Sequence, residues 1–200
     1  DTAWVRRYNG PTNGNDSATA LFVDNNGNVY VTGVSYDSVT YDDYATLKYD
    51  ANGNLLWIRR YNGPANYPDY ATALFVDNNG NVYVTGGSYG SGTASDYATL
   101  KYDANGNLLW ERRYDGPGNG YDYATALFVD NNGNVYVTGY SQGSGTYYDY
   151  ATIKYIQEQP GMSEGKIKRE EKSGFYEAKK TYDVSGKLVK ENKLKKVSIL

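Results

Sequence analysis

The chain contains no histidine and no cysteine among its 200 residues. Without them it cannot build a Ser-His triad, a cysteine nucleophile, a zinc site of thiolates or imidazoles, or a disulfide. No apolar run has the length of a membrane-spanning helix, so we expect no membrane insertion. The carboxylates of residues 1–160 recur as turn elements or lie in loops, as the adjacent Asp42 and Asp43 do. Since neighbouring acids on a loop make poor acid-base partners, we expect no catalytic residue, and also no metal and no cofactor.

Tyrosine and glycine are abundant instead, with 24 and 23 residues. Helix-favouring runs of Ala, Leu, Glu and Lys are missing from residues 1–160, and this composition favours strands joined by tight turns. The formal charge is −8 over residues 1–160 and +5 over residues 161–200. An acidic repeat region repels phosphate, so nucleic acid is not an expected partner. A basic tail can attract the acidic region of its own chain or of another copy.

Three near-copies of a 53-residue unit fill residues 1–160. The interval holds without insertion for a tryptophan, an aspartate and a tyrosine: Trp4, Trp57 and Trp110; Asp24, Asp77 and Asp130; Tyr44, Tyr97 and Tyr150. A fixed period of this size indicates a repeat architecture, in which no unit buries its apolar face alone. We therefore expect the function to lie on the assembled surface.

Each unit contains four strand patterns separated by turn residues. In the second copy they are residues 71–76, 82–85, 97–102 and 108–114, and Asn-Gly pairs follow the first and the third. The pattern predicts an all-β fold of propeller-type blades with four antiparallel strands, the first at the crowded axis and the fourth at the rim. A β-solenoid is the rival, although its coils usually repeat at shorter intervals and lack hairpins. Paired arginines such as Arg59 and Arg60 on the fourth strand are expected to discourage unwanted edge pairing.

Residues 71–86 (ATALFVDNNGNVYVTG), 96–103 (DYATLKYD) and 108–117 (LLWERRYDGP) resemble the bacterial and archaeal β-propeller repeat family abbreviated SBBP. The resemblance covers roughly residues 1–156 and implies a propeller-type fold in a secreted or surface protein. It carries no shared catalytic residues. The chain begins at Asp1 rather than Met, either because a signal peptide has been removed or because the chain was prepared to start there, and we favour the first explanation. We therefore expect an extracellular or cell-surface location.

Residues 161–200 form a separate basic tail. Short strands are expected at residues 166–172, 175–181, 187–194 and 196–199. Residues 182–190 weakly resemble the sorting or anchoring modules that follow repeats in secreted bacterial proteins. The tail is therefore predicted to be an extra blade, an anchor or an assembly element.

The Asp-Asn-Asn-Gly-Asn turns at residues 24–28, 77–81 and 130–134 place oxygens at alternate positions, as calcium loops do. Their glycine stands fourth instead of sixth, however, and no bidentate Glu follows. We favour hairpin turns in which Asp and Asn cap their own backbone.

In a four-stranded meander, the turns after the first and third strands share one face, and the remaining connections share the other. Turns of the first kind are nearly identical between copies, whereas the loops at 35–41, 88–94 and 141–147 differ. Tyr, Ser, Gly and Asn on loops over a rigid scaffold are typical of a recognition surface for a carbohydrate or a protein. Alternatively, these loops differ between copies only because packing constrains them less than the turns on the other face. The candidate binding residues are Tyr36, Tyr41, Tyr67, Tyr89, Tyr121 and Tyr147.

The two ends of the repeat region are complementary. Thr2–Asn9 has the pattern of a fourth strand without its blade, and the third unit stops after its third strand, Tyr150–Ile156. Three blades are too few for a closed ring. The tail can act as a fourth blade, two chains can form a six-bladed ring, or copies can join head to tail by strand complementation.

We predict a non-catalytic structural or interaction protein that self-associates head to tail, as a ring or a filament. The residues expected at the contact are Trp4, Arg6, Arg7, Tyr150 and Lys154. The alternative is a monomeric propeller that binds a partner through its loop face.

Overall fold

The computed structural model describes residues 1–157, 168–173, 176–182 and 188–193. Every regular element in these ranges is a β-strand, and within them no helix is long and apolar enough to cross a membrane. The chain divides into two compact units, Asp1–Gln157 and Glu158–Leu200.

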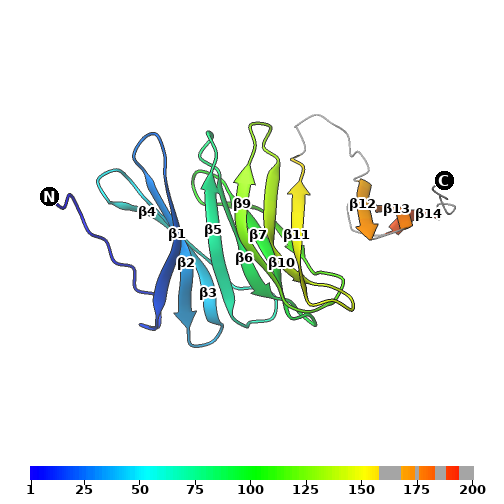
Figure 1. The fold of residues 1–200 in the computed structure, drawn as a ribbon. Coiled ribbons are helices and arrows are strands. Elements are labelled where there is room, and N and C mark those ends of the chain that lie inside the picture. The colour runs from blue at the N-terminus through cyan, green and yellow to red at the C-terminus, as the bar shows by residue number, and fades with distance from the viewer. Residues whose placement is uncertain (158–167, 174–175, 183–187, 194–200) are drawn as a thin grey trace. The chain divides into compact units, whose positions relative to one another are not determined.

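The first unit consists of three antiparallel sheets in chain order, which we call blades 1, 2 and 3 (Figure 1). Blade 1 contains β1 (Asp16–Val23), β2 (Val29–Asp37), β3 (Tyr41–Tyr49) and β4 (Leu55–Tyr61). Blade 2 contains β5 (Asp69–Val76), β6 (Val82–Tyr89), β7 (Ser95–Tyr102) and β8 (Leu108–Tyr114). Blade 3 contains β9 (Asp122–Val129), β10 (Val135–Gln142) and β11 (Tyr148–Tyr155). The predicted all-β fold of propeller-type blades is confirmed, and the sheets do not close.

The blades stack face to face, and their first strands lie next to one another. β5 contacts both β1 and β9, as expected for the strand nearest the axis. Tyr30 of blade 1 belongs to the same buried cluster as Val82, Val84 and Leu100 of blade 2. Burial of these alternating apolar side chains between two sheets supplies the main driving force for stacking. No blade could bury both of its faces alone.

The Asp-Asn-Asn-Gly-Asn turns cap their own backbone, as predicted. Asp77 Oδ1 accepts the backbone N–H groups of Asn79 and Asn81, both at 2.9 Å. Asp77 Oδ2 accepts the Asn81 side chain at 2.8 Å and the Tyr83 hydroxyl at 3.0 Å. Gly80 has a φ of 78°, a left-handed conformation that glycine adopts without strain. Both carboxylate oxygens of Asp77 are therefore used within the hairpin.

Replacing Gly80 by Val should lower the free energy of unfolding by about 1–2 kcal/mol, because a β-branched residue resists positive φ. Urea denaturation measures the loss, and Asn78→Val in the same turn is the control. A loss no greater than that of the control would contradict this account of the turn.

Residues Thr2–Asn9 correct one prediction: they belong to no sheet in the described structure, although their sequence has the pattern of a fourth strand. A segment forms a strand only when its backbone can pair with the edge of another strand. Blade 1 already has four strands, β1–β4, and the segment does not pair with any of them. The fourth-strand arginines also differ from expectation. Arg60 and Arg113 turn into their own blades and are only partly exposed. Arg59 is also half-buried, so Arg112 is the one exposed arginine on β4 and β8.

The second unit contains a three-stranded antiparallel sheet of β12 (Lys168–Ser173), β13 (Tyr176–Tyr182) and β14 (Leu188–Lys193). These strands fall where the first three tail strands are expected. The strand expected at residues 196–199 lies outside the described residues.

Candidate interaction surfaces

The fourth strand of blade 1 bonds to a turn of blade 2. The Trp57 indole N–H on β4 donates to the carbonyl of Ala104 at 3.2 Å, in the β7–β8 turn of blade 2. Arg59 donates to the carbonyls of Gly106 and Asn105 in the same turn. Trp57 thus anchors blade 1 to the β7–β8 turn of blade 2.

The segment of residues 2–9, which we call the N-terminal segment, makes the same contacts on blade 1. The Trp4 indole N–H donates to the carbonyl of Ala51 at 3.2 Å, and Arg6 donates to the carbonyls of Gly53 and Asn52. The Trp4 ring lies 6.2 Å from the ring of Tyr49, close to the 6.4 Å between the equivalent rings in the next blade. The N-terminal segment therefore lies against blade 1 as β4 lies against blade 2, in the place of the fourth strand of a preceding blade. Its backbone belongs to no sheet.

Blade 3 has the complementary feature. β11 pairs with β10 on one side, and within the described residues no strand pairs with its other side. Exposure at equivalent positions changes accordingly: the Tyr150 side chain is 96% exposed, against 1% for Tyr44 and 0% for Tyr97. At the opposite end, Val23 of β1 is 53% exposed, whereas Val76 of β5 is 5% exposed. Both ends of the stack thus present side chains that another blade covers elsewhere.

Where a following blade covers this position, its backbone carbonyls accept hydrogen bonds from the tyrosine hydroxyl. Tyr44 donates to the carbonyls of Gly87 and Ala98 in blade 2, both at 3.4 Å. Tyr97 donates to the carbonyl of Ala151 in blade 3 at 3.2 Å. The predicted contact residue Tyr150 is the third member of this series.

Lys154 belongs to a second series at the same end. Its ammonium lies 5.2 Å from the ring centre of Tyr136, a cation–π arrangement that recurs in each blade. The equivalent Lys48 also donates to the carbonyl of Ala104 in the next blade at 3.3 Å. In blade 2, Lys101 finds the side-chain oxygen of Gln157 at 2.8 Å instead. Gln157 thereby replaces the turn carbonyl that a following blade provides.

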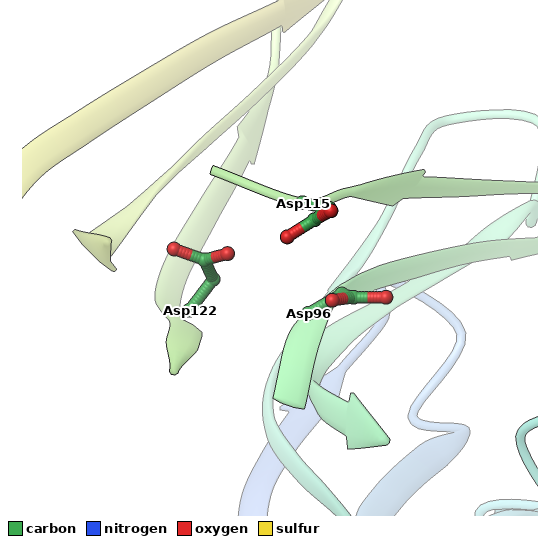
Figure 2. A group of neighbouring side chains, drawn as sticks. All are labelled: Asp96, Asp115 and Asp122. Carbon is green, nitrogen blue, oxygen red and sulfur yellow. The ribbon is translucent and has the colours of Figure 1, made fainter. Parts of the chain in front are cut away.

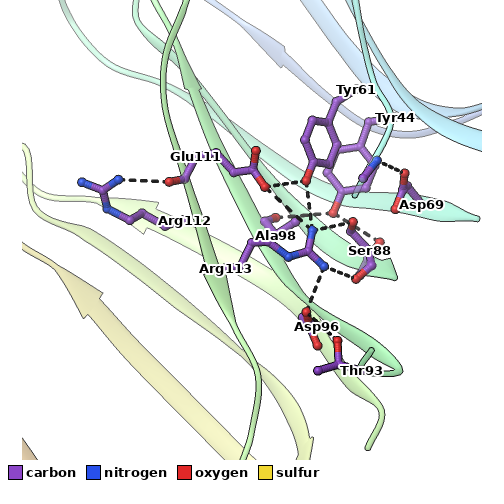
Figure 3. A network of polar contacts seen from close by, with 12 residues as sticks. Tyr44, Tyr61, Asp69, Ser88, Thr93, Asp96, Ala98, Glu111, Arg112 and Arg113 are labelled. Atoms are coloured by element: carbon purple, nitrogen blue, oxygen red, sulfur yellow. Dashed lines mark hydrogen bonds and ion pairs between the residues drawn. The ribbon is translucent and has the colours of Figure 1, made fainter. Parts of the chain in front are cut away.

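A buried polar network holds the fourth strand to its blade (Figure 3). The Arg113 guanidinium on β8 donates to the Ser88 hydroxyl at 2.7 Å, the Ser88 carbonyl at 2.6 Å and the Asp96 carboxylate at 2.9 Å. It also donates to the Tyr61 hydroxyl at 3.0 Å. Asp96 is buried, so this ion pair shields a charge that would otherwise stand alone in the blade. The same network recurs in blade 1 with Arg60, Ser35, Asp43 and Tyr8.

Three aspartates meet where blade 2 joins blade 3 (Figure 2). One oxygen from each of Asp96, Asp115 and Asp122 lies within 4.8 Å of the other two. Burial, and then the charges of Asp96 and Asp122, raise the pKa of Asp115. Asp122 accepts a backbone N–H at 2.6 Å, and Asp96 is paired with Arg113. Hydrogen-bond donors of the chain itself therefore engage two of the three carboxylates. We interpret the cluster as a structural part of the junction between blades 2 and 3.

Asp69 at the preceding junction titrates in an unusual range. Burial raises the pKa of Asp69 to about 6, the charge of Asp43 adds to the effect, and hydrogen bonds from Ser88 and Gly63 oppose it. A folded-state pKa above the unfolded value of about 3.9 means that the protonated carboxyl is the form that the fold favours. Its contribution to stability is full below about pH 4 and is lost as the pH rises through about 6.

For a shift of about two pKa units, the unaltered protein should lose about 2–3 kcal/mol of stability between pH 4 and 6 through this carboxyl. We expect Asp69→Asn to lack this loss. Asn retains an acceptor for the Gly63 backbone N–H. Urea denaturation of both proteins across this range is the measurement. Parallel stability profiles would show that Asp69 does not titrate as described.

The loop face places four of the six predicted tyrosines in one row. Ring centres are 5.9 Å apart for Tyr41 and Tyr67, 5.6 Å for Tyr67 and Tyr89, and 6.3 Å for Tyr89 and Tyr121. A hydrogen bond with Tyr121, followed by burial, raises the pKa of Tyr89 to about 12. We call these four residues the tyrosine row; it runs from β3 of blade 1 to the link that leads into β9 of blade 3.

Tyr36 and Tyr147 lie outside the tyrosine row, although both are exposed. A second series of rings was not predicted: Tyr70, Tyr123, Tyr140 and Tyr148. Tyr140 and Tyr148 line an open depression of about 580 Å³ together with Asp149 and Tyr150. The signal that sequence analysis could have used is Tyr140, since the other copies have Gly87 and Val34 at its position.

One comparison with known proteins bears on these surfaces. Residues 113–145 match the SBBP beta-propeller repeat. The resemblance inferred from the sequence is thereby confirmed for a stretch that runs from Arg113 at the end of β8 to the loop after β10. The 53-residue period places the equivalents of this SBBP stretch at residues 60–92 and 7–39. A search of curated proteins finds no match.

Proposed function

We propose that this protein is a non-catalytic structural or interaction protein of the cell exterior, whose copies associate head to tail by strand complementation. The N-terminal segment of one copy pairs with β11 of another and completes blade 3 as its fourth strand. One observation carries the proposal: the N-terminal segment already makes the side-chain contacts of a fourth strand on blade 1, while its backbone is in no sheet.

The internal blades supply the register of this contact. In blade 2, Lys101 of β7 lies opposite Trp110, Ala98 opposite Arg113 and Tyr97 opposite Tyr114. The same register places Lys154 opposite Trp4, Ala151 opposite Arg7 and Tyr150 opposite Tyr8 of the second copy. The backbone groups of β11 then gain partners, and the exposed faces at the two ends cover one another. Repeating the contact is a heterologous association, which yields a filament or a closed ring.

Deletion of residues 1–9 tests the proposal. We expect the intact chain to form concentration-dependent oligomers in sedimentation velocity, and the deleted chain to remain monomeric. A synthetic peptide of residues 1–10 should bind β11 of the intact chain in place of a second copy and so reduce the size of the oligomers. Equal particle sizes with and without the segment would mean that strand exchange does not join the copies.

A second function is favoured by the tyrosine row: the loop face binds an extended carbohydrate by stacking sugar rings on the tyrosines. The row uses positions at which the copies differ, since Tyr67 is replaced by Gly14 and Gly120 in the other units. Tyr41 also has a φ of 65°, a conformation that costs a bulky residue about 1–2 kcal/mol. Strain of this kind gathers at binding sites.

Affinity electrophoresis against a panel of soluble polysaccharides tests the carbohydrate function. Tyr67→Ala, in the middle of the tyrosine row, should abolish retardation, whereas Tyr147→Ala outside the row should not. Retardation by no polysaccharide, or equal loss in both variants, would exclude the tyrosine row as a sugar site.

A further inference from the structure

The guanidinium network of blades 1 and 2 has an incomplete counterpart in blade 3. The hydroxyl of Ser141, at the position of Ser88, belongs to a residue that is 4% exposed, and it has no hydrogen-bond partner among the described residues. A buried hydroxyl without a partner is uncommon in folded proteins. In blades 1 and 2 the equivalent hydroxyl accepts a hydrogen bond from a fourth-strand arginine.

The remaining acceptors of the network are in place in blade 3. Thr146 donates to Asp149 Oδ2 at 2.8 Å, as Thr93 donates to Asp96 at 3.1 Å. Asp149 is nevertheless exposed, whereas Asp96 is buried beneath its arginine. Tyr114 on β8 stands where Tyr61 offers its hydroxyl to Arg113. Ser141, Asp149 and Tyr114 therefore form a preset acceptor site for a guanidinium, which we call the arginine socket.

The sequence limits which arginine can fill the socket. The pattern Trp-x-Arg-Arg-Tyr occurs at residues 4–8, 57–61 and 110–114, and nowhere in residues 158–200. Its second arginine enters the network in both complete blades. In the N-terminal segment that residue is Arg7, which is exposed, while Arg6 is already bonded to the carbonyls of Gly53 and Asn52.

We propose that Arg7 of a second copy binds the arginine socket of blade 3 and fixes the register of head-to-tail association. The proposal rests on the self-association described above and names its specificity contact. The planar fork of arginine bonds Ser141 and Asp149 together, which the single ammonium of a lysine cannot do. The occupant is therefore a second copy of this chain, recognised through its fourth-strand pattern.

A charge exchange between copies tests the proposal. Arg7→Glu places two carboxylates at each contact and Asp149→Arg places two guanidiniums there, so either variant alone should associate at least about tenfold more weakly. Mixed in equal amounts, they should form an alternating assembly, because each contact again joins opposite charges. Arg6→Glu is the matched control: it keeps both Arg7 and Asp149, so on its own it should associate more strongly than Arg7→Glu does. Sedimentation velocity measures all mixtures.

The Arg7→Glu chain also permits a test independent of assembly, because its socket is intact and its own segment is disabled. A labelled peptide of residues 1–10 should bind it, and Arg6→Lys in the peptide should change the affinity little. Arg7→Lys should weaken binding about tenfold through loss of the fork. Fluorescence anisotropy gives the affinities.

The two experiments separate the two proposals. If the intact chain associates and the charge variants associate equally well, the socket is wrong and strand complementation stands. If the intact chain stays monomeric but the peptide discriminates at position 7, the socket stands and head-to-tail association is wrong. If the peptide does not bind, or binds equally with lysine at position 7, the socket is wrong regardless of assembly.

Discussion

Arg113→Ala is expected to lower the free energy of unfolding by about 3–5 kcal/mol, because it leaves the buried Asp96 carboxylate without its partner. The Ser88 hydroxyl loses its donor at the same time. Arg113→Lys should recover only part of the loss, since an ammonium cannot reach both residues in the fork geometry. Urea denaturation of the three proteins provides the comparison.

The neighbouring Arg112 is the matched control for this prediction. It is exposed, donates only to the carbonyl of Glu111 among the described contacts, and lies over the Trp110 ring at 5.5 Å. We expect Arg112→Ala to cost no more than about 1 kcal/mol. Similar losses for Arg112→Ala and Arg113→Ala would show that the polar network does not hold the fourth strand.

The blades could be predicted from the sequence because their signals are local. Alternation along residues 97–102 and the Asn-Gly pair in the following turn depend only on neighbours in the chain. Repetition at 53 residues then multiplied the same signal three times. For the same reason the capping by Asp77 was predictable: donor and acceptor lie within six residues.

The guanidinium network could not be predicted in this way, because register brings it together. Arg113 is 17 residues from Asp96 and 25 from Ser88, and it meets them because Ala98 pairs with Arg113 while Ser88 pairs with Asp96. A sequence signal did exist. Serine, aspartate and arginine each recur at the repeat interval, and repetition of polar residues inside strands indicates a shared buried contact.

The N-terminal segment illustrates a different limit. Its pattern predicted a strand, and its side chains do make the contacts of a fourth strand. Those side-chain contacts require only blade 1, on which the segment lies. Strand pairing requires in addition a free strand edge, such as that of β11. Sequence periodicity does not separate the two requirements, so the pattern alone could not reveal that only one of them is met within this chain.

The repeat offers a matched pair of tyrosines that separates folding from assembly. Tyr97→Ala removes a side chain that is 0% exposed, together with its hydrogen bond to Ala151, so stability should fall by roughly 3–5 kcal/mol. Tyr150→Ala removes the equivalent side chain at 96% exposure, and the monomer should lose no more than about 0.5 kcal/mol.

Association should respond in the opposite way. If blade 1 of a second copy covers blade 3 as blade 3 covers blade 2, Tyr150 becomes the buried tyrosine of the new junction. Its hydroxyl then reaches the carbonyl of Ala45 in the second copy, as Tyr97 reaches Ala151. Tyr150→Ala should therefore weaken association by at least about tenfold while the melting temperature of the dilute monomer stays unchanged. Unaltered association of a fully folded Tyr150→Ala chain would mean that the exposed face of blade 3 is not where the copies meet.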